Sequence, residues 1–189
     1  GRSGRIREED VIKSAANAPA VKSAPAVKTS TMRRLIAQRT ATSFATIPHF
    51  YLRVEVDATA LVRLREDLLP DIESTTGLRV TLSDLLLRAQ ALALNDFPAA
   101  NCIWADHALV PLSGYDVGLV VGLPEGLMIP VVRSANEGDL AAVTKQRASL
   151  VAAAKAGRLT QDQMQGGATS LSNLGNSPVD EFAAVISPG

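Results

Sequence analysis

Residues 117–132 read Val-Gly-Leu-Val-Val-Gly-Leu-Pro-Glu-Gly-Leu-Met-Ile-Pro-Val-Val, and this stretch decides the fold. It contains two continuous apolar runs of strand length, Val117–Val121 and Leu127–Val132. The Leu-Pro-Glu-Gly between them puts Pro124 and Gly126 where a tight turn requires them. Because both faces of each run are apolar, we expect two strands in the middle of a covered sheet.

Helices are predicted on either side of these strands. Val80–Asn95 is apolar on most sides, which predicts a helix buried on more than one face and capped by Thr81 or Ser83. After the strands, Asp139 caps a long helix over Leu140–Ala156. Strands that alternate with helices indicate an α/β domain with a mixed sheet.

The residues before position 80 predict two helices and one strand. A helix begins within Thr29–Thr31 and is broken at Ile47-Pro48. Residues 50–56 then alternate strictly between apolar and polar side chains, which predicts a half-buried strand. Asp57 caps the next helix, which we expect to extend to Pro70. Its predicted buried stripe is Leu61, Leu64 and Leu68.

Three further elements complete the prediction. Asn101–Trp104 and Ala108–Leu112 form a short hairpin, and Phe182–Ile186 form a last strand. Thr160-x-x-Gln163 is a capping-box pattern for one more helical turn. The chain stops soon after the last strand, so we expect a mixed α/β domain that is incomplete at its C-terminus.

Composition narrows the function classes. The chain has 189 residues, of which 47% are hydrophobic and 20% charged, as in a soluble globular protein. No apolar run approaches the ~20 residues of a membrane span, so no membrane partner is expected. Aromatic residues make up only 4% of the chain, which argues against nucleic-acid binding. The single cysteine excludes an internal disulfide framework and favours a reducing compartment.

The N-terminal residues differ from the rest in charge and composition. Residues 1–39 hold nine of the 19 lysines and arginines but three of the 19 acidic residues. Residues 1–14 form a glycine-containing loop that runs into a short helical turn. Residues 15–30 are almost entirely Ala, Pro, Val, Lys and Ser, which is typical of a linker. The predicted domain therefore spans residues 31–189.

The stretch Gly166–Gly175, Gly-Gly-Ala-Thr-Ser-Leu-Ser-Asn-Leu-Gly, concentrates hydroxyl groups. Read as a strand, it places Ser170, Ser172 and Leu174 on one face. A serine just before a glycine-marked bend can project into a cleft and donate to a developing oxyanion. The pattern also fits a strand end with ordinary turn chemistry, and on spacing alone that interpretation is favoured.

Other candidate residues carry weaker signals. His49 and His107 are each expected to be a boundary or surface histidine, and Cys102 a small buried thiol beside Trp104. Arg65 is either solvated or in reach of an anionic ligand. No Cys/His cluster has metal-ligand spacing, so no metal site is expected.

Several stretches together carry a family resemblance. They are Met32-Arg-Arg-Leu-Ile-Ala-Gln-Arg, Ile47-Pro-His-Phe-Tyr-Leu, much of Val80–Ala135, and the Ser-Asn-Leu-Gly that begins at Ser172. This set resembles the 2-oxoacid dehydrogenase acyltransferases, the dihydrolipoamide acyltransferase components of pyruvate dehydrogenase and related complexes. The likeness covers residues 31–187 in order, and the segment around His49 favours the acetyl-transferring branch.

The resemblance implies a two-layer, chloramphenicol-acetyltransferase-like fold that assembles as a homotrimer within a larger core. Residues 1–14 resemble the end of the family's peripheral subunit-binding domain, and the lipoyl domain would lie upstream, outside this chain. The implied partners are the 2-oxoacid decarboxylase and dihydrolipoamide dehydrogenase components. The implied compartment is the bacterial cytoplasm or the mitochondrial matrix.

The resemblance also implies a reaction, which is acyl transfer from a dihydrolipoyl thioester to coenzyme A. By resemblance, Ser172 stabilises the oxyanion, and Arg65, Thr81 and Asn173 contact coenzyme A together with Ser172. The family's general base comes from a His-x-x-x-Asp-Gly motif that this chain does not contain. We therefore expect the chain alone to be inactive.

Two alternatives remain open at this point. The chain can be a non-catalytic core or binding protein that keeps the fold and the assembly surface. It can also be a free-standing antibiotic O-acetyltransferase, although the linker and the binding-domain remnant argue against this.

Overall fold

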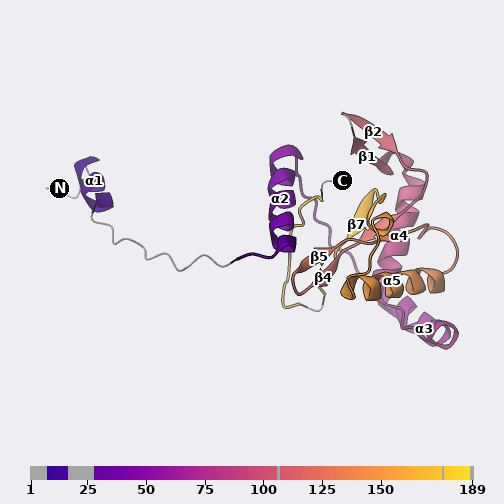
Figure 1. Ribbon diagram of the computed structural model, residues 1–189. Coiled ribbons are helices and arrows are strands. Elements are labelled where there is room, and N and C mark those ends of the chain that lie inside the picture. Colours follow the sequence, from indigo (N-terminus) through magenta and orange to yellow (C-terminus); the bar gives the residue numbers. More distant parts are fainter. Residues whose placement is uncertain (1–7, 17–27, 106, 176, 188–189) are drawn as a thin grey trace.

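The computed structural model describes residues 8–16, 28–105, 107–175 and 177–187. Figure 1 shows the order of the elements along the chain. The helices are α1 (Glu8–Ala16), α2 (Thr31–Thr46), α3 (Thr59–Thr76), α4 (Leu82–Asp96) and α5 (Leu140–Lys155), with 3₁₀ turns η1 (Pro98–Ala100) and η2 (Asp162–Met164). The strands are β1 (Cys102–Ala105), β2 (Ala108–Pro111), β3 (Val117–Leu119), β4 (Val121–Leu123), β5 (Gly126–Met128), β6 (Val131–Val132) and β7 (Thr169–Leu171).

Strand β3 lies at the centre of a mixed sheet in the order β6-β3-β7. It pairs antiparallel with β6, where Val117 is opposite Val132, and parallel with β7, where Val117 is opposite Thr169. All three residues of β3 and both residues of β6 are buried. The predicted central position of this apolar run is therefore confirmed.

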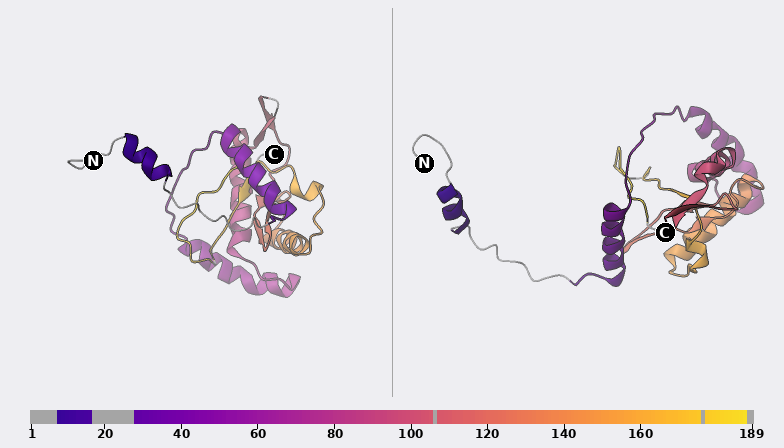
Figure 2. Two further views of the ribbon diagram at one scale, coloured as in Figure 1. Left: turned by 60° about the vertical axis from the view of Figure 1, so that its left-hand side comes forward. Right: turned by 90° about the horizontal axis from the view of Figure 1, so that it is seen from above.

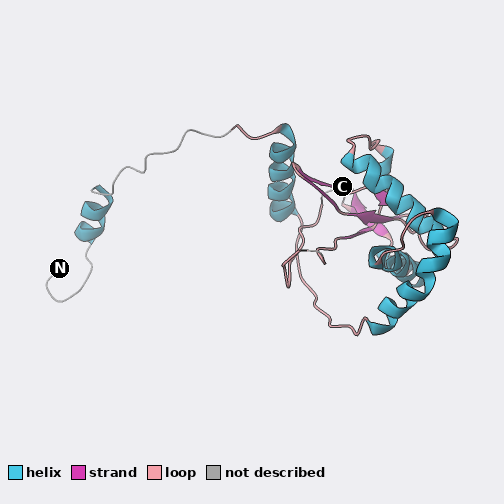
Figure 3. Cartoon of the chain, turned by 90° about the horizontal axis from the view of Figure 1, so that it is seen from below, coloured by secondary structure: helices cyan, strands magenta, loops and turns pink. Residues whose placement is uncertain are grey.

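The two predicted strands are each divided in two by the structure. Strands β4 and β5 form a separate antiparallel hairpin, which reaches from the sheet towards α2 (Figure 3). On the return path Pro130 has no N–H to donate to a ladder, and it separates β5 from β6. Gly126 in the hairpin has φ of +156° and lies so close to Ile36 of α2 that a Cβ there would overlap the isoleucine side chain. The positive φ therefore favours glycine where the hairpin meets α2, and a side chain there would also have to displace the end of Ile36.

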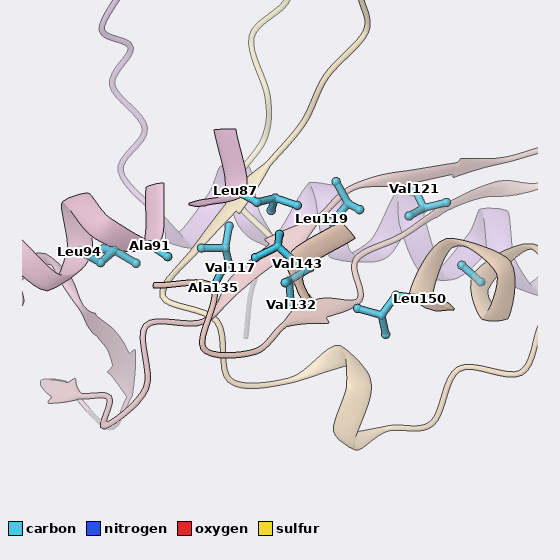
Figure 4. Close-up of a cluster of buried hydrophobic side chains, with 11 residues drawn as sticks. Leu87, Ala91, Leu94, Val117, Leu119, Val121, Val132, Ala135, Val143 and Leu150 are labelled. Carbon is cyan, nitrogen blue, oxygen red and sulfur yellow. The ribbon is translucent and has the colours of Figure 1, made fainter. Parts of the chain in front are cut away.

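Helices α4 and α5 pack against the sheet and each other, and they enclose the core (Figure 4). Figure 2 shows the same group of elements from two further sides. The core residues come from α4, α5, the sheet and the loops beside it: Leu87, Ala91, Leu94, Val117, Leu119, Val121, Val132, Ala135, Val143, Leu150 and Ala154. The prediction that the 80–95 helix is buried on more than one face is confirmed, except that Leu92 is 42% exposed.

The predicted helix ends agree with the structure at most positions. Ser30 caps α2, Thr81 caps α4 and Asp139 caps α5, each by accepting a backbone N–H with its side-chain oxygen. In the pattern that predicted a turn at 160–163, the Gln163 side chain accepts from the Thr160 N–H at 3.0 Å. The short polar side chains at these positions satisfy N–H groups that the helix itself leaves unpaired.

Residues 50–56 are not a strand, which corrects the prediction from their alternation. The backbone is extended, but it has no strand partner among the described residues. The apolar side chains are Phe50, Leu52, Val54 and Val56, and their exposed fractions are 80%, 86%, 80% and 77%. Alternation shows that a segment suits a half-buried strand, but a strand also requires a partner backbone. Phe182–Ile186, the predicted last strand, is likewise unpaired.

Two smaller predictions are also wrong. Helix α3 continues through Pro70 to Thr76, and its buried residue is Ile72, whereas Leu64 is 46% exposed. The β1–β2 hairpin forms as predicted, but Cys102 is half-buried and Trp104 is 67% exposed. The hairpin lies outside the core, so Cys102 is not a core thiol.

The N-terminal predictions are only partly covered by the described residues. Helix α1 includes the expected helical turn and extends to Ala16. Residues 1–7 of the predicted binding-domain remnant and residues 17–27 of the predicted linker lie outside the described part of the chain. Within the described residues, no helix is both long and apolar enough to cross a membrane.

Leu87→Ala should lower the free energy of unfolding by about 2–5 kcal/mol, because it leaves a cavity in a fully buried part of the core. Leu92→Ala on the same helix removes the same atoms from an exposed position and should cost less than about 1 kcal/mol. Urea denaturation followed by circular dichroism measures both changes. Equal losses for the two variants would contradict the assigned burial of α4.

Asp57 supplies a prediction about pH. The side chain and backbone N–H of Thr59 both bond the Asp57 carboxylate, and they hold its pKa below the ordinary value. Because the folded-state pKa is lowered, the stabilisation is present above the unfolded pKa and is lost as the pH falls through the folded pKa. Carboxyl-detected NMR should show that Thr59→Ala raises the titration midpoint of Asp57. An unchanged midpoint would contradict the contact.

Candidate functional site

Ser172 follows β7 immediately, at the end of the segment singled out by its hydroxyl groups. β7 is fixed on one side by its pairing with β3. From α4, the Gln90 amide donates to the Thr169 hydroxyl at 3.0 Å. The Ser172 side chain is half-buried. The strand therefore presents this serine at the edge of the sheet, and not in its core.

Asn173 connects the end of β7 to the start of α4. Its Nδ2 donates to the Ser83 hydroxyl at 3.3 Å. Its Oδ1 accepts from the Gly175 N–H at 2.8 Å, which closes a turn of the kind that asparagine favours. A polar pocket of about 190 Å³ opens beside this contact and is lined by Ser83, Asn173, Leu174, Gly175 and Ser177.

Thr81 performs a structural task at the start of α4. Its hydroxyl donates to Asp84 Oδ2 at 2.8 Å, and its backbone N–H donates to the same oxygen at 2.7 Å. Asp84 is fully buried, and Arg147 of α5 pairs with its carboxylate at 2.8 Å. The Thr81 hydroxyl is thus already engaged by a buried carboxylate.

Arg65 lies beside the same helix start. Its Nε donates to the carbonyl oxygen of Val80 at 3.3 Å, and its side chain is half-buried. This hydrogen bond connects α3 to Val80, the residue before Thr81. The two terminal guanidinium nitrogens make no hydrogen bond to the described residues, so they can pair with an anion.

The four predicted site residues lie in two pairs, both next to the start of α4. Asn173 contacts Ser83, and Ser172 adjoins Asn173 in the chain. Arg65 contacts Val80, which adjoins Thr81. All four residues therefore border the first turn of α4 or the strand end that touches it.

Ser83 was predicted only as a possible helix cap, and it also lines the pocket. Its position two residues after Thr81, in the first helical turn, is the only signal that the sequence holds.

Arg133 is a further residue that the sequence did not single out. Its guanidinium binds the Asp116 carboxylate and the backbone oxygens of Asp162 and Gln165, each at 2.7 Å. The Ser134 N–H donates to the same carboxylate at 2.8 Å. Arg133 thereby holds the loop that leads into β7, at the end opposite Ser172.

The other candidates do not join the site. His107 lies in the turn of the β1–β2 hairpin with φ of +63° and is exposed. His49 lies just beyond the end of α2, as a boundary histidine should. The larger pocket, of about 380 Å³, lies between α2 and the β4–β5 turn and shares no residue with the site. In the described ranges, no group of three or more His, Cys, Asp or Glu residues could hold a metal ion.

Solved structures define the class of protein to which this fold belongs. The dihydrolipoamide acetyltransferase of Azotobacter vinelandii superposes with a TM-score of 0.81 at 26% identity, over 87% of this chain and 68% of that one. That structure was solved to investigate a serine, a histidine and an asparagine in its catalytic mechanism. The cubic core of a pyruvate dehydrogenase multienzyme complex matches with a TM-score of 0.80 over the same shares. The expected α/β fold with a mixed sheet is thus confirmed as an acyltransferase core.

Residues 22–189 match the family described as 2-oxoacid dehydrogenases acyltransferase (catalytic domain), and this chain belongs to that family. It is 39% identical over 160 residues to the dihydrolipoyllysine-residue acetyltransferase component of the pyruvate dehydrogenase complex of Rhizobium meliloti, covering 83% of this chain. It is 31% identical over 195 residues to the corresponding component of Rickettsia conorii, covering the whole chain. The chain spans 36% and 47% of the lengths of these two relatives.

Arg147→Met should lower the free energy of unfolding by about 3–5 kcal/mol, because it leaves the Asp84 carboxylate buried without its partner. Arg33→Met is the matched control. Arg33 pairs with Glu125 at 3.9 Å, but both side chains are more than half exposed, so its loss should cost at most about 1 kcal/mol. Urea denaturation compares the two variants. A small effect of Arg147→Met would show that the ion pair does not hold the helix start.

Proposed function

We propose that this chain is the catalytic domain of a dihydrolipoamide acyltransferase, which moves an acetyl or other acyl group from a dihydrolipoyl thioester to coenzyme A. The observation that carries the proposal is the family membership of residues 22–189 together with the position of Ser172 and Asn173 beside a polar pocket. The relatives named above are acetyltransferase components of pyruvate dehydrogenase complexes, which favours the acetyl group.

The reaction requires a base, an attacking thiolate and a donor for the oxyanion. A base removes the proton from the coenzyme A thiol, and the sulfur attacks the thioester carbonyl. The tetrahedral intermediate collapses, the bond from the acyl carbon to the dihydrolipoyl sulfur breaks, and the leaving sulfur takes up the proton. The negative charge on the carbonyl oxygen exists only between these steps, so a hydroxyl directed at it accelerates the reaction selectively.

We assign the oxyanion donor to Ser172. It lies at the end of a strand that is fixed by sheet pairing and by the Gln90–Thr169 contact, so its hydroxyl can be held in place before the charge develops. We assign the base to the histidine of the family's His-x-x-x-Asp-Gly motif, which residues 1–189 do not include. His49 and His107 lack the His-x-x-x-Asp-Gly context of the family.

We place coenzyme A against the first turn of α4. Asn173 and Ser83 supply polar groups in the pocket, and Arg65 supplies a guanidinium for an anionic part of the ligand. Thr81 remains in this set, but its hydroxyl is bonded to Asp84, so we expect it to orient the helix start and to contact the ligand only secondarily.

The same proposal covers assembly and location. One matching structure is described as the cubic core of a multienzyme complex, which supports a homotrimer as the unit of a larger core. The lipoamide would be carried on an upstream lipoyl domain, and the partners would be the decarboxylase and dihydrolipoamide dehydrogenase components. Relatives include bacterial proteins and a mitochondrial one, which supports the bacterial cytoplasm or the mitochondrial matrix as the proposed compartment.

Ser172→Ala should lower kcat by about two to three decades in a full-length form of the protein that carries the histidine motif, because it removes the oxyanion donor. Ser170→Ala, two residues earlier and on the same face of the segment, is the control and should retain activity. Transfer from acetyl-dihydrolipoamide to coenzyme A is the assay. An unchanged kcat in Ser172→Ala would return Ser172 to ordinary turn chemistry.

The 189-residue chain alone should show no appreciable transfer in the same assay, because neither of its histidines is placed to act as the base. Normal turnover by this chain would refute the requirement for an outside histidine. If the full-length form is also inactive yet still assembles into a core, the alternative of a non-catalytic assembly protein is favoured.

A further inference from the structure

One residue near the C-terminal end of the chain is held through its backbone by two side chains that lie far from it in the sequence. Ser43, on the last turns of α2, is fully buried, and its hydroxyl donates to the carbonyl oxygen of Ile186 at 2.6 Å. His49, just after α2, contacts the N–H of the same residue, with 3.1 Å between Nε2 and the Ile186 nitrogen. Ile186 is thus bonded at both of its backbone polar groups.

The contacts of His49 assign its tautomer. Its Nδ1 lies 2.7 Å from the carbonyl oxygen of Ile47, which can only accept, so Nδ1 carries the proton. Nε2 then holds a lone pair. Ser43 Oγ lies 3.5 Å from Nε2, but its one hydrogen is directed to Ile186 O, so the lone pair accepts the Ile186 N–H. This arrangement exists only while the imidazole is neutral.

The surroundings of the ring hold it in position. Phe44 stacks on it with 5.1 Å between ring centroids and 24° between planes, and the Tyr51 ring is 6.5 Å away. Arg53 and Glu181 pair with each other and tie the same two segments a second time. The remaining charged residues on the elements packed here make no hydrogen bond to His49 within the described residues: Arg33, Arg34, Arg39, Glu55, Asp57 and Asp180.

We propose that His49 is a pH-sensitive latch that holds the segment 179–187 against the end of α2 when neutral and loosens it when protonated. Histidine is the side chain whose ordinary titration falls between about pH 5 and 8. A second ring proton would bind at Nε2 and point at the N–H of Ile186. The hydrogen bond between them would then be replaced by two donors facing each other. The latch goes beyond the proposed acyl transfer and does not depend on it.

The loosening should be local. The Ser43 bond to the Ile186 carbonyl and the Arg53–Glu181 ion pair involve no histidine, so both persist in mildly acidic solution. Only the amide side of Ile186 loses its acceptor. The expected result is a segment that opens from α2 more often, while the core around β3 is unchanged.

NMR of the full 189-residue chain tests the latch. At about pH 7.5 the imidazole nitrogen shifts of His49 should show a proton on Nδ1 and none on Nε2. Between about pH 7.5 and pH 5, protection of the Ile186 amide, corrected for intrinsic exchange, should fall about fivefold to tenfold, as expected for one lost hydrogen bond. His49→Phe keeps an aromatic ring beside Phe44 without an acceptor, and should show the low protection at both pH values.

His107→Gln is the matched control, because it removes the other histidine, which lies exposed in a hairpin turn. It should leave the pH dependence of Ile186 intact. A proton on Nε2 of His49 at about pH 7.5 would overturn the proposal. So would protection of Ile186 that does not change with pH, or a pH dependence lost in His107→Gln. If His49→Phe does not fold, the tautomer and the pH response of the unsubstituted chain still decide the question.

Discussion

The buried carboxylate of Asp84 is the group on which the rest of the arrangement depends. It accepts from the backbone and hydroxyl of Thr81 and pairs with Arg147, so one side chain fixes the start of α4 and joins it to α5. A buried carboxylate is tolerated only when hydrogen bonds and an opposite charge replace its contacts with water, and Thr81 and Arg147 supply both to Asp84. These contacts fix the helix start that borders the pocket beside Ser83 and Asn173.

Local chemistry made the helices and the central strands predictable from the sequence. The caps at Ser30, Thr81 and Asp139 each require a short polar side chain before a helix, and the apolar run of β3 requires burial on both faces. These signals act within a few residues, so the sequence displays them directly. The position of Ser172 at a strand end was predictable for the same reason, while the role we propose for it rests on the family resemblance.

Features that depend on distant partners were not predictable. The alternation of residues 50–56 correctly indicated an extended backbone, but whether a strand pairs depends on a second segment elsewhere. Leu64 was expected inside because it falls on an apolar helical stripe, and Cys102 because a small thiol favours burial, but tertiary packing leaves Leu64 exposed and Cys102 half-buried. The contacts of Ser83, Arg133 and His49 join residues far apart in the chain, and no spacing in the sequence reports them.

The parallel pairing of β3 with β7 has a consequence for how the site is made. Val117 meets Thr169 only after the chain has passed through three further strands, β4, β5 and β6, and the whole of α5. The segment between β3 and β7 loses conformational entropy when its two ends come together, and no strand contact compensates for this loss until they meet. We therefore expect this pairing to form late and slowly. Ser172 follows β7, and a chain emerging from the ribosome therefore acquires its candidate oxyanion donor only after the helical layer that supports it is complete.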